Sequence, residues 1–276
     1  MIQDIYPYVM TNHYNPNQKA KKGDKIFYFE NNQIITKPDG RFFQYEDCPN
    51  NDRYIYLFSM GTHHFFLSDL RSLEHTSFSA RQLRYYEPQF LGFAALTALH
   101  LFHWYQDNQY CGKCGQLLQL DKKERALRCP HCQHVLYPKI SPAIIVAIIN
   151  SKNQLLVTKY AQGDYQKYAL VAGYSEIGET IEQTVIREVQ EETGLKVKNI
   201  RYYKSQPWGF SSSLLFGFFA QVDGDESIHM DTEELRLARW ADPSEDLDTN
   251  GVASLTGEMV ELFLTGRYKD FYTLEK

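Results

Sequence analysis

The sequence predicts an α+β protein with three successive parts. Residues 1 to about 90 contain short aromatic and β-branched runs separated by Asn, Asp, Gly and Pro, a pattern typical of short strands. Four cysteines in two CxxC pairs follow this region. Further along, an apolar run suited to a buried strand precedes a long segment with helical periodicity. These observations indicate a mainly-β part, a small ribbon, and a domain that combines strands with a helix.

The composition is that of a globular chain long enough for two domains. Of the 276 residues, 43% are hydrophobic and 23% are charged. No run of about 18 apolar residues occurs, and the first ten residues lack a basic lead into an apolar segment. We therefore expect neither a membrane span nor a signal peptide, and a cytoplasmic protein. The net charge of −5 argues against a general nucleic-acid binder, although a local basic patch is compatible with it.

The first predicted part, residues 1–106, is a small mainly-β domain that ends in a helix. Its strand-like runs are KIFYFE, QIITK, RFFQY and RYIYLFSM, and no catalytic constellation occurs among them. Residues 91–106 are apolar on nearly all sides, which predicts a buried connecting helix. We expect its His100 and His103 to be core or surface histidines, because the cysteines that follow already supply four metal ligands.

The second part, residues 107–137, has the cysteine spacing of a zinc ribbon. Two CxxC pairs are separated by fourteen residues, and each pair turns tightly enough for both thiolates to reach one ion. Four thiolates close the tetrahedron, so we expect structural Zn²⁺ that takes no part in catalysis. Iron in the same site and two disulfides are the rival interpretations, and the reducing cytosol disfavours the disulfides. The predicted ligands are Cys111, Cys114, Cys129 and Cys132. Cys48, alone in EDCPN, is expected to be a free thiol.

The third part, residues 138–276, is the predicted catalytic domain. Residues 137–149 read YPKISPAIIVAII, and residues 155–160 read LLVTKY after a turn at 151–153. We expect these two runs to form the hairpin that begins the catalytic sheet. Residues 173–195 read GYSEIGETIEQTVIREVQEETGL. Thr180 and Gln183 have the spacing of a capping box, and Gly194 suits the left-handed residue after a helix end.

The glutamates of this helix predict a divalent metal site. Glu188, Glu191 and Glu192 stand at i, i+3 and i+4, so their side chains project from one face. Like charges repel unless a cation lies between them, and Mg²⁺ or Mn²⁺ prefers carboxylate oxygens. A solvated acidic surface is the alternative interpretation. Such a metal site suits attack on a diphosphate, which needs neutralised oxygens and an activated water. Glu191 or Glu192 would be the base, and spacing does not separate the two.

The whole segment resembles the Nudix box, and every fixed position of that motif is filled. The resemblance implies hydrolysis of a nucleoside diphosphate linked to another group, within an α/β/α sandwich around a mixed sheet. We expect Arg187 and Glu179 to form an ion pair that fixes the loop against the helix. The matching residues are Gly173, Glu179, Arg187, Glu188, Val189, Glu191, Glu192, Gly194 and Leu195.

A zinc ribbon ahead of a Nudix box is similar to the NADH pyrophosphatase branch of the Nudix hydrolases. Residues 205–213 read SQPWGFSSS, where that branch has SQPWPFPxS. Gly209 and Ser211 replace two prolines, so we expect a less pre-organised loop and a less certain substrate preference. Trp208, Phe210 and Tyr174 would stack on flat rings of a dinucleotide, with a core-filling role as the alternative for Trp208 and Phe210. The branch also implies substrate contacts by Gln206 and Ser213. It implies a further metal ligand at Glu234, for which the adjacent Glu233 is the alternative.

We therefore expect a metal-dependent enzyme that cleaves NADH or NAD⁺ into AMP and nicotinamide mononucleotide. The resemblance also implies a homodimer and the removal of NAD caps from RNA. A Nudix hydrolase that prefers ADP-ribose or dinucleoside polyphosphates is an alternative. A zinc-ribbon adaptor with an inactive Nudix domain is another, but it predicts loss of the box carboxylates, and all of them are present.

Overall fold

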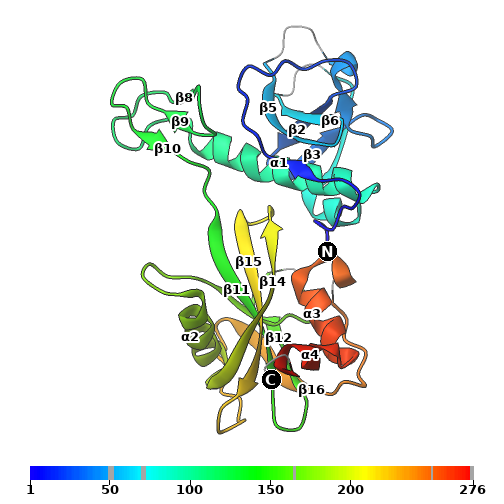
Figure 1. Cartoon of the computed structure of the whole chain (residues 1–276), viewed down its shortest axis with the longest axis vertical. Coiled ribbons are helices and arrows are strands. Elements are labelled where there is room, and N and C mark those ends of the chain that lie inside the picture. The colour runs from blue at the N-terminus through cyan, green and yellow to red at the C-terminus, as the bar shows by residue number, and fades with distance from the viewer. Residues whose placement is uncertain (49–52, 70–72, 164–165, 250, 274–276) are drawn as a thin grey trace. The chain divides into compact units, whose positions relative to one another are not determined.

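The computed structural model describes residues 1–48, 53–69, 73–163, 166–249 and 251–273, and the chain divides into two compact units (Figure 1). We call residues 2–139 with 209–212 the N-terminal unit, and residues 1, 140–208 and 213–276 the C-terminal unit. Within the described residues, no helix is long and apolar enough to cross a membrane.

Aromatic strands build the N-terminal unit. Its sheet has the order β1-β5-β6-β2-β3-β7, with β4 paired to β2, and β2 runs parallel to β6. Successive residues of β2 enter two different cores, Phe27 and Phe29 on one face and Ile26 and Tyr28 on the other. The strands are β1 (Met10–Thr11), β2 (Lys25–Glu30), β3 (Gln33–Thr36), β4 (Phe43–Gln44), β5 (Ile55–Met60), β6 (His63–Leu67) and β7 (Thr76–Ser79). Short 3₁₀ helices occupy η1 (Tyr45–Asp47) and η2 (Ala80–Tyr85).

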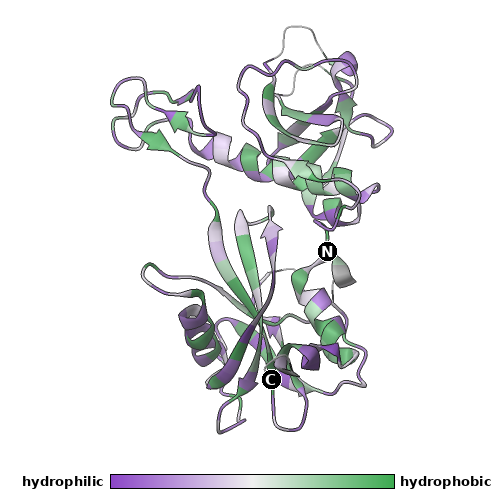
Figure 2. Ribbon diagram, viewed as in Figure 1, coloured by the Kyte–Doolittle hydropathy of each residue, from purple (hydrophilic) through white to green (hydrophobic). Residues whose placement is uncertain are grey.

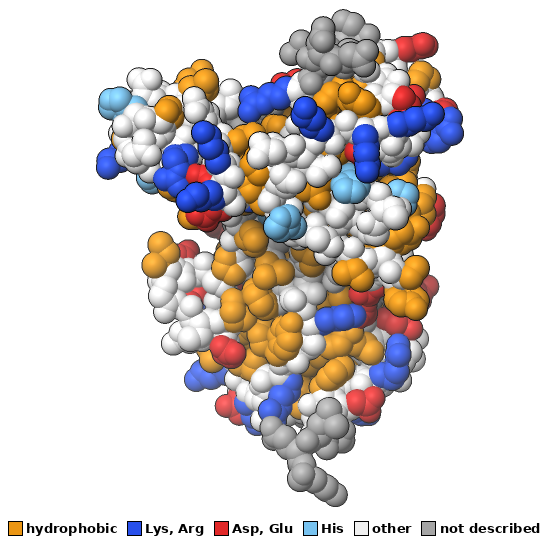
Figure 3. All heavy atoms as spheres, turned by 45° about the horizontal axis from the view of Figure 1, so that its top comes forward, with side chains coloured by type: hydrophobic (Ala, Val, Ile, Leu, Met, Phe, Trp, Pro, Cys, Tyr) orange, Lys and Arg blue, Asp and Glu red, His pale blue; other side chains and the backbone are white. Residues whose placement is uncertain are grey.

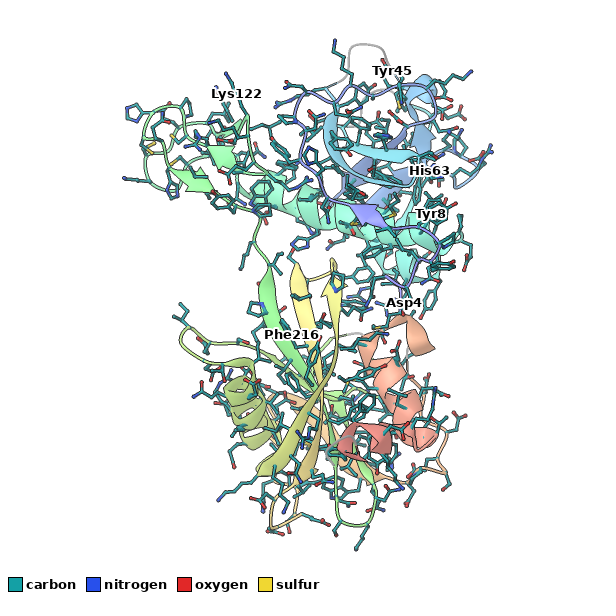
Figure 4. The ribbon with its side chains drawn as sticks, in the orientation of Figure 1. Asp4, Tyr8, Tyr45, His63, Lys122 and Phe216 are labelled. Atoms are coloured by element: carbon teal, nitrogen blue, oxygen red, sulfur yellow. The ribbon has the colours of Figure 1, made fainter. Side chains whose placement is uncertain are left out.

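The predicted connecting helix is present as α1 (Gln89–Asp107), and it packs in the larger core of this unit. Near its start, the Phe90 ring stacks on Tyr8 with the centroids 4.0 Å apart, and His63 lies 5.3 Å from the same ring (Figure 4). Cys111 and Cys129 belong to the same core cluster. The ribbon, with strands β8 (Gln119–Leu120), β9 (Leu127–Arg128) and β10 (Val135–Leu136), is therefore packed on the helix that precedes it.

The C-terminal unit is built on a mixed sheet with the order β14-β15-β11-β12-β16, and β13 also pairs with β11. β11 and β15 are parallel, and the other pairs are antiparallel. The predicted hairpin is confirmed, because β11 and β12 pair antiparallel with Ile149 opposite Leu155. The strands are β11 (Ser141–Ile149), β12 (Leu155–Tyr160), β13 (Val171–Tyr174), β14 (Val197–Trp208), β15 (Ser213–Val222) and β16 (Leu235–Ala241).

Helices cover both faces of this sheet, as the predicted α/β/α sandwich requires. Ile144, Val146 and Ile148 of β11 pack with α2 (Ile181–Thr193), whereas the alternating residues Ile145, Ala147 and Ile149 pack with α3 (Leu255–Leu264). Phe216 of β15 is half-buried on the α2 side (Figure 4). Figure 2 shows hydrophobic central strands and a largely hydrophilic α2. The segments η3 (Gly251–Ala253), η4 (Arg267–Lys269) and α4 (Asp270–Thr273) complete the unit.

Candidate active site and zinc ribbon

The glutamate helix α2 begins and ends where the sequence predicts. The Thr180 hydroxyl accepts the Gln183 N–H at 3.2 Å, and the Gln183 side-chain oxygen accepts the Thr180 N–H at 2.8 Å. Gly194 follows the helix with φ 71°, a left-handed conformation that glycine adopts without steric cost. Val185 and Val189 are fully buried, so the apolar flank of α2 fixes the rotation of the helix on the sheet.

Arg187 connects this helix to the loop before it. Its guanidinium donates to both carboxylate oxygens of Glu179, at 2.6 and 2.9 Å, and to the Tyr174 carbonyl at 2.9 Å. One of its nitrogens, Nη1, also donates to Glu188 at 2.8 Å and to Glu191 at 2.9 Å. The hydrogen bonds from Arg187 to Glu179, together with one from the Glu176 N–H, lower the pKa of Glu179 to about 2.

Glu179 has a further partner that the sequence analysis did not identify. The Thr184 hydroxyl donates to Glu179 Oε2 at 3.0 Å and also to the Thr180 carbonyl at 3.1 Å. Thr184 is fully buried in the first turns of α2. The sequence does not reveal the contact between Thr184 and Glu179, because it depends on how the loop before α2 folds back onto the helix.

Glu188 extends across the backbone of β13, and only glycine leaves room for it there. A Cβ atom placed on Gly173 would lie 1.9 Å from the Glu188 carboxyl carbon, far inside any real contact. The Glu188 side chain is only 12% exposed. Burial raises the pKa of Glu188, and the neighbouring Arg187 guanidinium opposes that rise. Glycine at position 173 therefore leaves the space that the Glu188 side chain, a candidate metal ligand, occupies.

Glu192, one turn further along α2, is the most buried of the box carboxylates. It is 3% exposed, and its Oε2 has no hydrogen-bond partner among the described residues. Burial raises the pKa of Glu192 to about 8, with smaller contributions from the charges of Glu188 and Glu234, while a hydrogen bond from the Ala172 backbone opposes the rise. A buried carboxylate oxygen without a donor is costly unless a cation or a proton reaches it.

The remaining carboxylates surround this pair without closing on a common point. Glu191 is 59% exposed and is held by Arg187. Glu234 is exposed, and the segment that carries it is tied to α2 because the Asp231 N–H donates to the Glu192 carbonyl at 3.0 Å. Within the described ranges, the four cysteines are the only set of three or more ligand atoms that lie within 4.8 Å of one another. The structure thus brings the predicted glutamates to one region but does not draw their oxygens together.

The donor set nevertheless fits a hard divalent cation. All four candidates, Glu188, Glu191, Glu192 and Glu234, offer carboxylate oxygens, which suit Mg²⁺ and Mn²⁺. The charges of Glu188 and Glu234 act on Glu192 strongly enough to raise its pKa. The unpartnered oxygen of Glu192 is the atom that a cation at this place would satisfy.

The predicted substrate residues at 174 and 205–213 lie in different surroundings. Tyr174 is 52% exposed, and its hydroxyl lies 3.3 Å from the Ser213 Oγ. Trp208, half-buried, ends β14 opposite Ser213. Gln206 is fully buried, where its amide donates to the Ala253 carbonyl at 3.2 Å and accepts the Leu255 N–H at 2.8 Å. These contacts give Gln206 a part in holding the start of α3, and a contact with substrate stays a prediction.

Phe210 belongs to the N-terminal unit, together with the rest of residues 209–212. Its half-buried ring packs against the larger core of that unit, and the Arg84 guanidinium lies 5.1 Å from the ring centroid. The sequence analysis did not single out Arg84. Its position next to a loop more than a hundred residues later in the chain leaves no mark in the sequence.

The four predicted cysteines form one cluster, with all four sulfurs within 4.8 Å of one another. Cys111 and Cys132 place their sulfurs 3.6 Å apart, and Cys114 and Cys129 place theirs 3.4 Å apart. Four thiolates around one zinc ion have sulfurs about 3.8 Å apart, whereas a disulfide bond is about 2.05 Å long. None of the five cysteines is in a disulfide bond, which agrees with the expected thiol at Cys48. The Cys48 thiol donates to the Gln44 carbonyl at 3.2 Å.

The two halves of the ribbon use the same backbone geometry. In each CxxC pair, the residue after the second cysteine is left-handed, Gly115 with φ 74° and Gln133 with φ 61°. Its N–H donates to the carbonyl of the first cysteine, at 2.8 and 3.0 Å respectively. Each knuckle therefore aims two thiolates at one point, which is what a closed structural zinc site needs. His100 lies elsewhere, with its Nε2 2.8 Å from the Lys139 carbonyl.

Two family models match adjoining stretches that together span more than half of the chain. Residues 139–262 match the NUDIX domain, and residues 106–137 match the NADH pyrophosphatase zinc ribbon domain. Residues 139–262 form a Nudix domain. This domain contains the α2 glutamates, and the zinc ribbon contains the four cysteines.

Curated relatives of this chain carry the name NAD-capped RNA hydrolase NudC. The protein of Photobacterium profundum is 47% identical over 109 residues, which is 40% of each chain. That of Actinobacillus succinogenes is 52% identical over 108 residues, 38% of this chain and 40% of the relative. That of Mannheimia succiniciproducens is 43% identical over 150 residues, 51% of this chain and 55% of the relative. The chain thus matches about half, or less, of the length of these relatives.

Proposed function

We propose that this protein is a metal-dependent pyrophosphohydrolase that cleaves the diphosphate of NADH or NAD⁺ into AMP and reduced or oxidised nicotinamide mononucleotide. The observation that carries the proposal is a pair of carboxylates one turn apart on α2. Glu188 is 12% exposed and lies over the backbone of Gly173, and Glu192 is 3% exposed. The match of the ribbon to the NADH pyrophosphatase zinc ribbon domain narrows the substrate class.

The catalytic cation would be Mg²⁺ or Mn²⁺, with Glu188, Glu191, Glu192 and Glu234 as its protein ligands. Such a cation supplies charge neutralisation at the phosphoryl oxygens and lowers the pKa of water. The chain's own residues do the rest. Arg187 holds Glu188 and Glu191 at fixed positions, and Glu192 or Glu191 would accept the proton of the attacking water.

For substrate binding we propose that flat side chains hold the rings of the dinucleotide. Tyr174 is the best placed of them, because it is exposed at the end of β13, one residue after Gly173. Its hydroxyl contact with Ser213 joins two residues proposed to bind substrate. Trp208 and Phe210 would supply further stacking surfaces, worth roughly 1–3 kcal/mol per base.

NAD-capped RNA is a second proposed substrate of the same site, since it presents the same diphosphate with RNA attached to the adenosine. The names of the curated relatives support this extension. We further propose that the active form is a homodimer, on the basis of the family resemblance. A reducing compartment such as the cytoplasm would suit the protein, because structural zinc requires the cysteines as thiolates.

A substrate panel tests the proposal. The purified chain, with Mg²⁺ or Mn²⁺, is incubated with NADH, NAD⁺, ADP-ribose, diadenosine polyphosphates and an NAD-capped RNA, and products are separated by chromatography. We expect AMP and nicotinamide mononucleotide from NADH, and the highest kcat/KM with NAD(H) or the capped RNA. A tenfold preference for ADP-ribose would contradict the assignment to NAD(H), and lack of turnover on every substrate would favour the adaptor alternative.

A further inference from the structure

The segment 209–212 is docked on the N-terminal unit through a glycine that has no room for a side chain. A Cβ atom on Gly209 would lie 2.4 Å from the Leu96 carbonyl oxygen and 3.0 Å from the Leu96 Cγ. The φ of Gly209 is outside the left-handed region, so space and not backbone conformation demands glycine here. Leu96 is buried in the middle of α1, and its backbone cannot retreat without moving the helix.

Next to this contact, Arg84 covers Phe210. The guanidinium carbon of Arg84 lies 5.1 Å from the Phe210 centroid and 6.0 Å from that of Tyr85, within the range of a cation–π interaction. Arg84 comes from η2, which directly precedes α1. Ser212, at the other end of the segment, is left-handed with φ 53°. The segment is therefore in contact with α1 at Gly209 and with η2 at Phe210.

We infer that Arg84 and Gly209 are positioning residues of the substrate loop, because they fix the conformation of residues 209–212. This inference rests on the proposed function, in which residues 205–213 contact the dinucleotide. In the branch motif, two prolines restrict the backbone of this loop. This chain has Gly209 and Ser211 at those positions, and contacts of the loop with Leu96 and Arg84 restrict it instead. The loss of prolines then does not loosen the loop, because contacts with Leu96 and Arg84 replace them.

Substitutions at Arg84 test the positioning role. Arg84→Met keeps an unbranched stem and removes the charge, whereas Arg84→Lys keeps a cation that can lie over the ring. We expect Arg84→Met to raise KM for NADH roughly threefold to tenfold with kcat nearly unchanged, and Arg84→Lys to restore part of the loss. Arg81→Met is the matched control, because Arg81 is exposed on the same short helix. Equal KM values for Arg84→Met and Arg81→Met would overturn the inference.

Substitutions at Gly209 distinguish docking on Leu96 from internal stiffness of the loop, because the two predict opposite changes in KM for NADH. If the loop relied on internal stiffness, Gly209→Pro would leave KM unchanged or lower it, since proline occupies this position in the branch motif. Docking on Leu96 predicts that Gly209→Pro and Gly209→Ala both raise KM for NADH, because either Cβ meets the Leu96 carbonyl. Unchanged or lower KM values in these variants would refute the docking.

A readout that does not depend on turnover separates this inference from the proposed function. Amide hydrogen exchange, followed by mass spectrometry over residues 208–213, should speed up in Arg84→Met and Gly209→Ala and stay as in the wild type in Arg81→Met. Circular dichroism and thermal unfolding check that each variant is folded. If the wild type did not hydrolyse NADH, the proposed function would fail, and the exchange rates would still decide whether Arg84 and Gly209 hold the loop.

Discussion

At the residue scale, the candidate site is a cluster of glutamate carboxylates that needs positive charge nearby, from an arginine, a cation or a proton. Arg187 supplies that charge to Glu179, Glu188 and Glu191 through its fork of donors. Glu192 receives none of these hydrogen bonds and is the most buried. The arginine thus holds the periphery of the cluster, and the centre is left for a cation or a proton.

The substitution Glu192→Gln is expected to abolish most activity and leave the fold intact. The amide keeps the shape of the side chain but provides neither a charged metal ligand nor a base, so kcat should fall by several orders of magnitude. Steady-state kinetics with NADH and saturating Mn²⁺ measure the loss. Glu182→Gln, at an exposed glutamate in the first turn of the same helix, is the control and should keep wild-type activity. Near-normal turnover in Glu192→Gln would remove this residue from the mechanism.

The same residue predicts how metal-free stability depends on pH. Burial raises the pKa of Glu192 from 4.5 to about 8, so the folded state favours the protonated form. Its contribution to stability is complete below pH 4.5 and is lost as the pH rises through 8, by an amount of the order of 3–5 kcal/mol.

Without added Mg²⁺ or Mn²⁺, the wild type should therefore lose urea stability between pH 5 and 9 relative to Glu192→Gln, which has no proton to lose there. Added Mg²⁺ or Mn²⁺ should reverse the loss at pH 8 in the wild type alone. If the free energy of unfolding of the two proteins varied with pH in the same way, burial would not raise the pKa of Glu192.

At the element scale, local rules predicted the parts that local contacts build. The capping box at Thr180 and Gln183 and the left-handed Gly194 fixed both ends of α2, because each involves neighbours within one turn. In RFFQY, by contrast, only Phe43–Gln44 is a strand. The Asp47 carboxylate accepts the Gln44 N–H at 2.9 Å and starts a 3₁₀ helix there, a competition that the aromatic run concealed.

Long-range contacts account for what the sequence could not predict in the candidate site. The buried amide of Gln206 bonds the backbone of Ala253 and Leu255, almost fifty residues later. Gly209 meets Leu96, and Phe210 meets Arg84, across more than a hundred residues. A motif gives the residue types of a loop, but which of them point to solvent and which pack inward depends on these distant partners.

The zinc ribbon gives a prediction about an element whose role is structural. Cys129 is fully buried, and it belongs to the core shared with α1. Cys129→Ser should therefore release zinc and lower thermal stability, because three thiolates hold the ion poorly and the ribbon strands are only two residues long. Zinc content by mass spectrometry and the Tm measure both effects. Cys48→Ser should retain one zinc and the wild-type Tm. Full zinc occupancy in Cys129→Ser would contradict the assignment of the ligand.

At the scale of the whole molecule, the charge is divided unequally along the chain. Residues 1–139 contain sixteen Lys and Arg against thirteen Asp and Glu, whereas residues 140–276 contain thirteen against twenty-one. Eight of the nine histidines are also in the first half. Figure 3 shows Lys and Arg side chains gathered on the visible face of the N-terminal unit. The net charge of −5 is therefore the sum of a positive first half and a negative second half, and an anionic polymer is attracted to the first half.

This division predicts that capped RNA and free NADH respond differently to salt. The RNA body of the proposed capped substrate adds phosphates, and we expect basic residues of the N-terminal unit to neutralise some of them. Each such contact adds about 0.7 to the slope of log affinity against log salt for a single strand. Between 50 and 300 mM KCl, kcat/KM for a 30-nucleotide NAD-capped RNA should fall roughly tenfold. For NADH, which lacks the RNA phosphates, it should change by no more than about twofold.

Charge reversal assigns the effect to one half of the chain. Lys122 and Lys123 are exposed on the ribbon, and Lys122 is labelled in Figure 4. The double substitution Lys122→Glu with Lys123→Glu should flatten the salt dependence for capped RNA and leave kcat/KM for NADH unchanged. Lys152→Glu with Lys196→Glu makes the same change in charge at exposed positions of the acidic half and should affect capped RNA less. Equal effects of the two pairs would mean that capped RNA responds to the net charge of the molecule and not to its distribution.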